Sequence, residues 1–486
     1  MFFRTLIAPS FVPWLRRASG LACALLTACG GGGGSNADPA PAAPTATPAY
    51  VVGTAAPLPS GATRVAQLVD VPWASLPAGT TVTVSPGTYG GPITITAQGT
   101  ATQPIRVVAA DPADPPVLTN SVDFQRAAWV QVSGLVVQQP VFGGFVIRQG
   151  SHHITVADSV VRQAPIGIDV TDGAGTGLAL LRNRIEDSTT NGISVDGVNA
   201  DPADRSLIQG NTVVGSGWHG IDLRGSHYRV EANTVTRSGQ AIGGTSGIHV
   251  YSGGAGEGTG AGNLLRYNRS YANADTQLSD GNGIQIDQWC DGNTVAFNLV
   301  WGNDGAGIIV YDGNSNEVYA NTARGNGLDP GGTHGTLGEL ILSGSAAGQT
   351  AGRPAGNRVY NNLLVATRNA VPALAVDSRA AAQTSNRVGP NLLFHAAGGA
   401  PLLAADTQVF STGPAIDAIS GTTGNLVTAP SFADVTQPLA DGLRLLASPG
   451  GSGVALTGQT DITGRTATAT DAGGVFFGAY FFFAAP

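Results

Sequence analysis

The sequence predicts an all-β solenoid, in which short strands joined by tight bends stack coil upon coil. Three observations predict it. A Gly-Ile dipeptide followed by alternating apolar and polar residues recurs six times between residues 166 and 312. An asparagine followed by a second short apolar run recurs with it. Helix signals are nearly absent, because glycine and asparagine interrupt every window of this region. Self-similarity at such a period is typical of solenoids, propellers and repeat arrays.

A targeting segment occupies the start of the chain. Three arginines precede the apolar run LACALLTA, which is too short to span a bilayer as a stable helix. The run ends in Leu-Thr-Ala followed by Cys29, which resembles the lipobox of bacterial lipoproteins, where the cysteine becomes the lipid-modified first residue. We therefore expect residues 1–28 to be a lipoprotein signal peptide and Cys29 to be the lipidation site. A plain secretory signal is the alternative.

Residues 29–49 are rich in glycine and then in alanine, proline and threonine, a composition that cannot bury a core. We expect them to form a tether between the lipid and the folded part of the chain. Gly30 directly after the lipid-bearing cysteine resembles outer-membrane sorting. The expected location is therefore the cell envelope, at the outer membrane, on its periplasmic or its surface face. The only expected contact with the membrane is the lipid anchor.

Each repeat combines a Gly-Ile unit with an asparagine unit. The glycines of the Gly-Ile units are 24 to 36 residues apart, and the units begin at Ile166, Asn191, His219, Ser246, Asn282 and Ala306. The asparagine units begin at Asn183, Asn211, Asn233, Asn268, Asn293 and Asn321. Asparagine tolerates the left-handed conformation, so we expect these asparagines to adopt it at sharp bends. Each repeat then forms two or three short strands, which bury a core only by stacking on the next repeat.

Side chains alternate between the two faces of a strand. In each Gly-Ile unit the residues one and three positions after the isoleucine should therefore point outward. Stacking aligns them in two ladders, with about 4.8 Å between neighbouring coils. The first ladder is Asp169, Ser194, Asp222, His249, Gln285 and Ile309, and the second is Thr171, Asp196, Arg224, Tyr251, Asp287 and Tyr311.

This pattern resembles the right-handed parallel β-helix proteins of the pectate-lyase-like superfamily, over about residues 75–400. The segments PWASLPAGTTVTVSPGTYGGPITI and NLVTAPSFAD are similar to the two ends of such proteins. The resemblance implies a single-stranded right-handed parallel β-helix over residues 50–425 and a C-terminal capping segment over 426–486. It also implies a linear, acidic polysaccharide as the partner, bound in a groove along the coils.

Composition excludes several other functions. The formal net charge is −8, and without residues 1–28 the chain has 21 arginines against 32 acidic residues, which argues against a nucleic-acid partner. The chain has no lysine, so a lysine base or a lysine Schiff base is excluded. After lipidation Cys290 is the one thiol left, so no intrachain disulfide can form. We expect Cys290 to be a small buried hydrophobic residue and the protein to be a monomer.

The centre of the two ladders is the candidate functional site. Structural β-helices favour ladders of like residues, whereas acids, an arginine, a histidine and a tyrosine follow one another here within three coils. Such residues transfer protons and neutralise charge. We therefore expect these residues to be catalytic: Asp222, Arg224, His249, Tyr251 and Asp287. The residues expected to bind substrate are His219, Gln285, Trp289, Tyr311 and Asp196. The alternative is a solvent-exposed face whose ion pairs contribute little to stability.

Three inserted segments should border this site. The longest gap between Gly-Ile units contains segments 253–262 and 272–281, and a third insertion covers 327–339 and brings a histidine. Insertions in a solenoid form loops on one face, which is often the binding face. Asp275 and Asp280 should then overhang the ladders, where they and Asp287 are candidate ligands of Ca²⁺, the one cofactor expected.

Three functions fit these observations. The favoured one is a polysaccharide lyase or a related uronate C5-epimerase. In it Arg224 neutralises the uronate carboxylate, His249 or Tyr251 acts as base or acid, and Asp222 orients His249. This set is similar to that of alginate-type lyases and epimerases, but the Asp-Pro-His-Asp motif of the epimerases is absent. The second function is an inverting glycoside hydrolase that uses Asp222 and Asp287. The third is a non-catalytic surface solenoid that binds polysaccharide.

Overall fold

The structure is a computed structural model that describes residues 49–345, 353–420, 423–451, 453–468 and 476–482. The expected signal peptide, Cys29 and all but the last residue of the expected tether lie outside the described residues. No helix in the described ranges is both long and apolar enough to cross a membrane.

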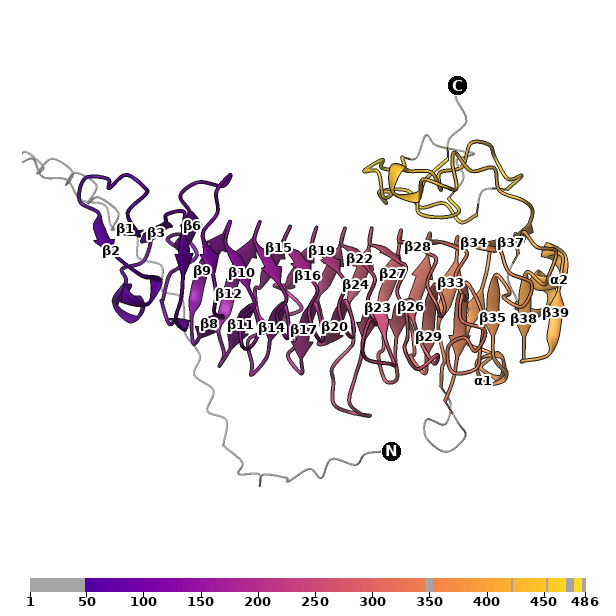
Figure 1. Ribbon diagram of the computed structural model, residues 1–486. Helices are drawn as coiled ribbons and strands as arrows, with labels where there is room; N and C mark the ends of the chain where they lie inside the picture. Colours follow the sequence, from indigo (N-terminus) through magenta and orange to yellow (C-terminus); the bar gives the residue numbers. More distant parts are fainter. Residues whose placement is uncertain (1–48, 346–352, 421–422, 452, 469–475, 483–486) are drawn as a thin grey trace, which may run out of the picture. The chain divides into compact units, whose positions relative to one another are not determined.

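The described chain winds into coils, and each coil contributes one strand to each of three sheets (Figure 1). Sheet A is β2 (Thr63–Val65), β1 (Ala49–Val52), β3 (Thr81–Val84), β6 (Ile105–Ala109), β9 (Ala128–Ser133), β12 (His152–Ala157), β15 (Ala179–Leu181), β18 (Leu207–Gln209), β21 (Arg229–Glu231), β24 (Leu264–Arg266), β27 (Thr294–Ala296), β30 (Glu317–Tyr319), β33 (Arg358–Tyr360) and β36 (Arg387–Val388). Sheet B is β4 (Thr88–Tyr89), β7 (Val117–Leu118), β10 (Val136–Gln138), β13 (Val160–Arg162), β16 (Arg184–Glu186), β19 (Thr212–Val214), β22 (Thr234–Thr236), β25 (Arg269–Tyr271), β28 (Leu299–Trp301), β31 (Thr322–Arg324), β34 (Leu363–Ala366), β37 (Leu392–His395) and β40 (Leu426–Val427).

Sheet C carries the Gly-Ile units. It is β5 (Ile93–Ile95), β8 (Val122–Gln125), β11 (Phe145–Arg148), β14 (Ile168–Val170), β17 (Ile193–Asp196), β20 (Ile221–Arg224), β23 (Ser246–Val250), β26 (Asn282–Ile286), β29 (Ile308–Tyr311), β32 (Leu340–Ser343), β35 (Leu374–Val376), β38 (Leu402–Ala404) and β39 (Gln408–Phe410). Among the described strands, β38 and β39 pair antiparallel, and every other pair is parallel. The predicted parallel β-helix is confirmed.

The alternation of side chains explains why these short strands are stable together. In β23, Ile248 and Val250 point inward and are fully buried, and equivalent residues of successive coils stack into one continuous apolar core. Burying a branched aliphatic side chain contributes about 1.5–3 kcal/mol. A strand of four residues cannot supply such a core by itself, so each coil depends on its neighbours.

Asparagines line the bends, but not in the expected backbone conformation. The left-handed residue is the one before the asparagine, as in Arg182 (φ 53°) before Asn183 and Ala232 (φ 54°) before Asn233. The asparagine side chain is buried instead. The Oδ1 atom of Asn233 accepts hydrogen bonds from the backbone N–H and the Nδ2 of Asn211 in the preceding coil, at 2.9 and 3.0 Å. The asparagines are therefore repeated because they satisfy the buried backbone of each bend.

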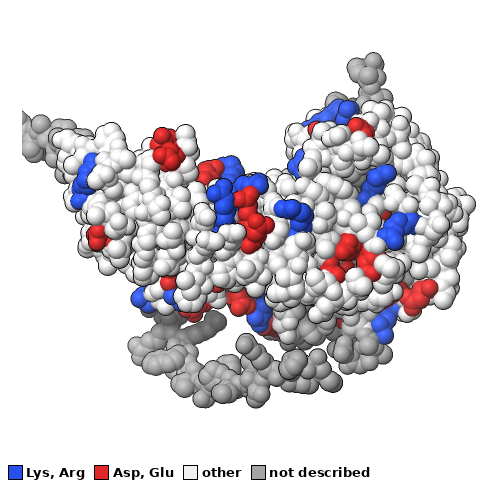
Figure 2. Space-filling view, viewed as in Figure 1, with Lys and Arg blue, Asp and Glu red and all other residues white. Residues whose placement is uncertain are grey.

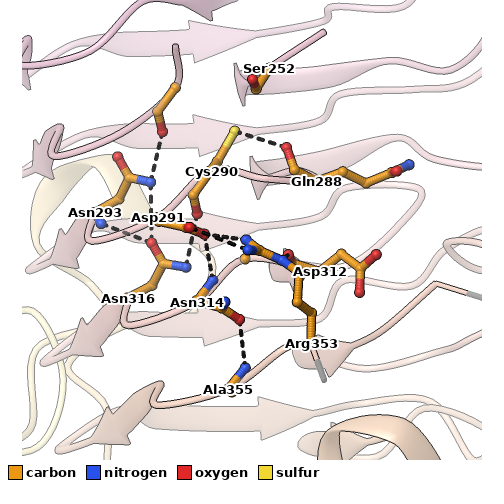
Figure 3. Close-up of polar contacts among 12 residues, drawn as sticks. Ser252, Gln288, Cys290, Asp291, Asn293, Asp312, Asn314, Asn316, Arg353 and Ala355 are labelled. Carbon is orange, nitrogen blue, oxygen red and sulfur yellow. Dashed lines mark hydrogen bonds and ion pairs between the residues drawn. The ribbon is translucent and has the colours of Figure 1, made fainter. Parts of the chain in front are cut away.

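The same ladder continues over most of the stack, through Asn183, Asn211, Asn233, Asn268, Asn298, Asn321, Asn362, Asn391 and Asn425. Asn293 belongs to a second ladder with Asn263, Asn316, Asn357 and Asn386 at another bend. Figure 3 shows Asn293 facing Asn316 in this second ladder.

Short helices close the two ends of the stack. The 3-10 helices η1 (Leu68–Asp70) and η2 (Trp73–Ser75) contribute Leu68 and Trp73 to the first coils of the core. At the other end α2 (Gly413–Ser420) contributes Ile416, after α1 (Ser378–Ala382). The segment beyond β40, which includes η3 (Pro438–Ala440), lies along the side of the coils (Figure 1). Phe481 packs against Phe297 there, and the role of this segment as a cap stays a prediction.

Cys290 is buried, as expected, in the turn that follows β26. Burial raises the pKa of its thiol well above the usual value. Figure 3 shows it beside Gln288, with the ion pair of Asp291 and Arg353 on the other side of the turn. A neutral, buried thiol is a packing group rather than a nucleophile.

Candidate active site

The register of sheet C places the predicted site residues on adjacent strands. Asp222 of β20 lies opposite His249 of β23, and His249 lies opposite Gln285 of β26. Asp196 lies opposite Arg224 in the same sheet. The predicted first ladder is therefore confirmed in order. The turns at both edges of the sheet add side chains that are distant in sequence.

A cavity of about 520 Å³ opens over these strands. All five residues predicted to be catalytic line it, as do His219, Gln285 and Asp196 of those predicted to bind substrate. The face is not the solvent-exposed ladder of the alternative interpretation, because His249 is 8% exposed and Gln285 is 3% exposed. The inserted segments form walls around the cavity, where Asp280 and His334 also line it.

His249 is held between two carboxylates. Its Nδ1 lies 2.9 Å from Oδ1 of Asp222, and its Nε2 lies 3.3 Å from Oδ2 of Asp287. Burial lowers the pKa of His249, but hydrogen bonds and charge interactions with Asp222 and Asp287 outweigh burial and raise it to about 10. The ring is therefore a cation at neutral pH, with both N–H groups donated to carboxylates. The sequence predicted His249 as base or acid. A ring protonated on both nitrogens has no free nitrogen to act as a base, so this half of the prediction is disfavoured, and the role of His249 stays a prediction.

His219 is the neutral counterpart of His249. The two rings stack at a centroid distance of 4.3 Å and an angle of 16°. Burial, together with repulsion from His249, lowers the pKa of His219 to about 3. Its Nδ1 accepts the backbone N–H of Ser246 at 3.1 Å, so the proton of the neutral ring is on Nε2. That Nε2–H donates to no other described residue.

The amide of Gln285 is oriented by two donors. Its Oε1 accepts hydrogen bonds from the Ser246 hydroxyl at 2.6 Å and from Nδ2 of Asn282 at 2.9 Å. Within the described part of the chain its Nε2 has no acceptor. His219 and Gln285 thus present N–H donors to one cavity, and neighbouring side chains fix the orientation of both.

Asp280 and Tyr251 have perturbed proton affinities in the same cavity. Burial raises the pKa of Asp280 to about 6, although His334, 3.7 Å away, opposes this shift. Burial and, after it, the charge of Asp287 raise the pKa of Tyr251. The Tyr251 ring stacks on His249 at 5.6 Å. Perturbed titratable groups gathered in a cavity are typical of catalytic sites.

Arg224 is already paired with two protein carboxylates. Its guanidinium pairs with Asp196 at 3.0 Å and also with Glu257 of the segment 253–262. The hydrogen bond from Arg224 lowers the pKa of Glu257 to about 2, so this pair stays ionised. Arg224 also lines the cavity, so its expected role in neutralising a uronate stays a prediction, with two protein carboxylates already bound to the same guanidinium.

Three predicted residues lie outside the cavity wall. Trp289 occupies the turn after β26 with a left-handed backbone (φ 59°) and does not line the cavity. Tyr311 stacks on His334 at 4.7 Å, next to the cavity rather than in it. The carboxylate of Asp275 accepts the backbone N–H groups of Gly244, Gln277, Ser279 and Asp280, so it holds its own loop together.

The predicted calcium ligands are not gathered at one point. Among the described residues, one group of three offers ligand atoms within 4.8 Å of one another, and it is His219, Asp222 and His249. Asp275, Asp280 and Asp287 do not form such a group. A site with two imidazoles is unlike the all-oxygen sites that Ca²⁺ prefers. The group of His219, Asp222 and His249 therefore does not suit Ca²⁺, and Ca²⁺ at Asp275, Asp280 and Asp287 stays a prediction.

Several residues near the cavity were not predicted from the sequence. Trp218 lines it, and its Nε1 donates to the carbonyl oxygen of Gly244 at 3.2 Å. Asn191 also lines it, and its Nδ2 donates to Asp222 at 3.2 Å. Glu257, which pairs with Arg224, was also not predicted. It is the single acidic residue of the glycine-rich segment 253–262, so the sequence already made it a candidate for a specific role. Trp218 directly precedes His219, so its position next to a predicted residue was a second signal.

Comparison with known proteins agrees with this fold. The family model described as the right handed beta helix region matches residues 124–326, which include the cavity-lining strands. The protein thus has a right-handed parallel β-helix fold. A search of curated proteins gave no match.

Solved structures of similar fold include three proteins. The A-module of mannuronan C-5 epimerase AlgE6 from Azotobacter vinelandii has a TM-score of 0.53 at 15% identity, over 73% of this chain and 92% of that chain. The AlgE4 A-module of the same organism has a TM-score of 0.45 at 13% identity, over 72% and 89%. The alginate lyase from Paenibacillus sp. str. FPU-7 has a TM-score of 0.40 at 16% identity, over 61% and 98%. The similarity to the AlgE6 A-module establishes a shared fold and says nothing about the activity of this protein.

Proposed function

We propose that the protein is an enzyme that acts on a uronate-containing polysaccharide and removes the proton α to a carboxylate. It acts as a β-eliminating lyase or as a C5-epimerase, which share this first step. The observation that carries the proposal is the content of one cavity: an acid with a near-neutral pKa, a phenol that keeps its proton, and N–H donors with no acceptor among the described residues. These groups belong to Asp280, Tyr251, His219 and Gln285.

Asp280 is the candidate general base. With a pKa of about 6 it is mostly ionised at neutral pH, yet it is more basic than an exposed aspartate. Tyr251 is the candidate general acid, because its raised pKa keeps the phenol protonated. In a lyase Tyr251 protonates the leaving oxygen. In an epimerase it returns a proton to the opposite face of C5.

The Nε2–H of His219 and the Nε2 of Gln285 are the candidate partners of the uronate carboxylate. Removal of the α-proton spreads negative charge onto that carboxylate, so oriented donors stabilise the transition state. The charged ring of His249 lies 4.3 Å from the His219 ring and adds positive potential. This assignment keeps the predicted substrate-binding role of His219 and Gln285 and makes His249 an electrostatic group.

The hydrolase alternative is less well supported. An inverting pair needs space between its carboxyl groups for a water and the scissile bond. The ring of His249 fills the space between Asp222 and Asp287 and is hydrogen-bonded to both. In addition, His219 and His249 lower the pKa of Asp222 in spite of its burial, which is unsuited to a general acid.

One experiment tests the proposal. The chain from residue 30 onward is incubated with a panel of polyuronates in D₂O, with Ca²⁺ or with a chelator. Deuterium at C5 is measured by mass spectrometry, and unsaturated ends by ultraviolet absorbance. We expect one of these signals in the wild type and a loss of at least 100-fold in Asp280→Asn and Tyr251→Phe. Asp304→Asn is the matched control, because burial also raises the pKa of Asp304 and it lies outside the cavity.

Each outcome distinguishes one function. Unsaturated ends indicate a lyase, and deuterium at C5 in intact chains indicates an epimerase. New reducing ends without either signal would move the function to a hydrolase. Polymer binding without any reaction would leave a polysaccharide-binding solenoid, and both of these results contradict the proposal.

We also propose that the enzyme is a monomer held at the outer membrane by lipid on Cys29. The lipobox-like Leu-Thr-Ala-Cys and the following glycine support the lipid anchor. Figure 2 shows arginines next to acidic residues on the visible face. In cells grown with radiolabelled fatty acid, the wild type should carry the label and Cys29→Ala should not. Equal labelling of Cys29→Ala would show that the lipid is not on Cys29.

A further inference from the structure

The outward face of sheet C changes character on the two sides of the cavity. On the preceding coils the outward residues Asp123, Val146 and Asp169 are partly exposed. On the following coils the equivalent residues are Ile309 and Ile341, which are 1% and 0% exposed. A strand face on a solenoid is buried only where another segment covers it.

The covering segment is the loop between β31 and β32. Its His334 donates a backbone N–H to the carbonyl oxygen of Ser279 at 2.9 Å, and the hydroxyl of Thr333 bonds to Asn282. The loop therefore reaches back to the coil of β26. Nearer β32 it lies on Ile341, where a methyl group added to Gly338 would be 2.9 Å from the side chain. His334 belongs to this loop and lines the cavity.

The preceding coils carry an exposed aromatic residue beside the same face. Phe142 is 72% exposed and Val141 is 70% exposed. The next residue, Gly143, lies against the outward face, because an added methyl group would be 2.9 Å from Val146 and 3.5 Å from Cβ of Asp169. Val146 is three coils from Asp222, which is about 14 Å along the stack.

From this asymmetry we infer that the polysaccharide binds by one end. The terminal sugars occupy the cavity against His334, and the rest of the polymer lies over the preceding coils and reaches Phe142. This inference rests on the proposed function and specifies how the same site receives its substrate. Phe142 offers a flat apolar ring to the flat apolar face of a sugar. The loop at residues 325–339 prevents the polymer from continuing across Ile309.

The first test is binding, which does not depend on catalysis. Uronate oligosaccharides of increasing length are titrated calorimetrically into Tyr251→Phe. We expect affinity to rise with length until the oligosaccharide reaches Phe142. Phe142→Ala should then weaken the longest oligosaccharides about 10-fold and leave the shortest unchanged. Leu439→Ala is the matched control, because Leu439 is 51% exposed in η3 and outside sheet C.

The second test uses oligosaccharides that carry a bulky group at one end. A label at one of the two ends should abolish binding, and the same label at the other end should be tolerated. His334→Ala should restore part of the lost binding, because it removes the side chain at the closed end of the cavity. Tolerance of both labels, or an affinity that does not respond to Phe142→Ala, would overturn the inference. No binding of any oligosaccharide would instead overturn the proposed function.

Discussion

The clamp of Asp222 and Asp287 on His249 predicts that this ring stays charged in alkaline solution. Its pKa rises from the usual 6.5 to about 10, which corresponds to a preference of about 5 kcal/mol for the charged ring. Burial acts in the opposite direction, so the two carboxylates supply the whole effect. Asp222→Asn keeps the shape of the side chain and removes one charge. We expect it to lower the pKa of His249 by about 2 units.

The assay is nuclear magnetic resonance of ¹⁵N-labelled histidine from pH 5 to 11. The chain has seven histidines, and His249→Gln identifies the signal by its loss. Asp158→Asn is the control, since Asp158 forms an exposed ion pair with Arg182 on another face. A wild-type ring that titrates near pH 6.5, or a pKa that is the same in Asp222→Asn, would refute the electrostatic description of the site.

The same clamp makes stability depend on pH. The folded-state pKa of His249 lies above its unfolded value, so the contribution is fully present below pH 6.5 and is lost as the pH rises toward about 10. The wild-type Tm should therefore fall between pH 7 and 10. In Asp222→Asn this fall should be smaller and should end at a lower pH, because only the folded-state pKa changes. A wild-type Tm that is constant over this range would contradict the reasoning.

Three further predictions concern buried polar groups. Asp280→Asn should raise Tm at pH 7.5 but not at pH 4. The folded-state pKa of about 6 makes ionisation of Asp280 destabilising above that pH, and the variant removes this ionisation. A variant with the wild-type Tm at pH 7.5 would contradict this. Asn298→Ala should lower the free energy of unfolding by about 2–4 kcal/mol, because it leaves the N–H groups of Asn268 and the carbonyl of Leu265 unpaired. Thermal denaturation measures this loss. Cys290 is fully buried, so it should react with a thiol reagent only after the protein unfolds. Rapid labelling of the native protein would contradict this burial.

The fold could be predicted from the sequence because its causes are local and repeated. Alternating residues decide which side chains of β20, β23 and β26 point inward, and the repeat aligns Asp222, His249 and Gln285 on successive coils. The repeated asparagines were recognised in the sequence, but the left-handed conformation expected of them was wrong. Their spacing marked the bends, but the hydrogen bonds between coils that explain it exist only in the stacked structure.

The sequence by itself determined the parallel β-helix and the two outward ladders, because side-chain alternation and coil stacking follow from strand geometry. Only the tertiary structure decided what the ladder residues do. The inserted loops pair Arg224 with Glu257 and bring Asp280 into the cavity, and the rings and carboxylates of neighbouring coils surround His249. A pKa depends on the distances to charges and on burial, and loops distant in sequence set both. For this reason we propose Asp280, which the sequence offered as a metal ligand, as the base, in place of the charged ring of His249.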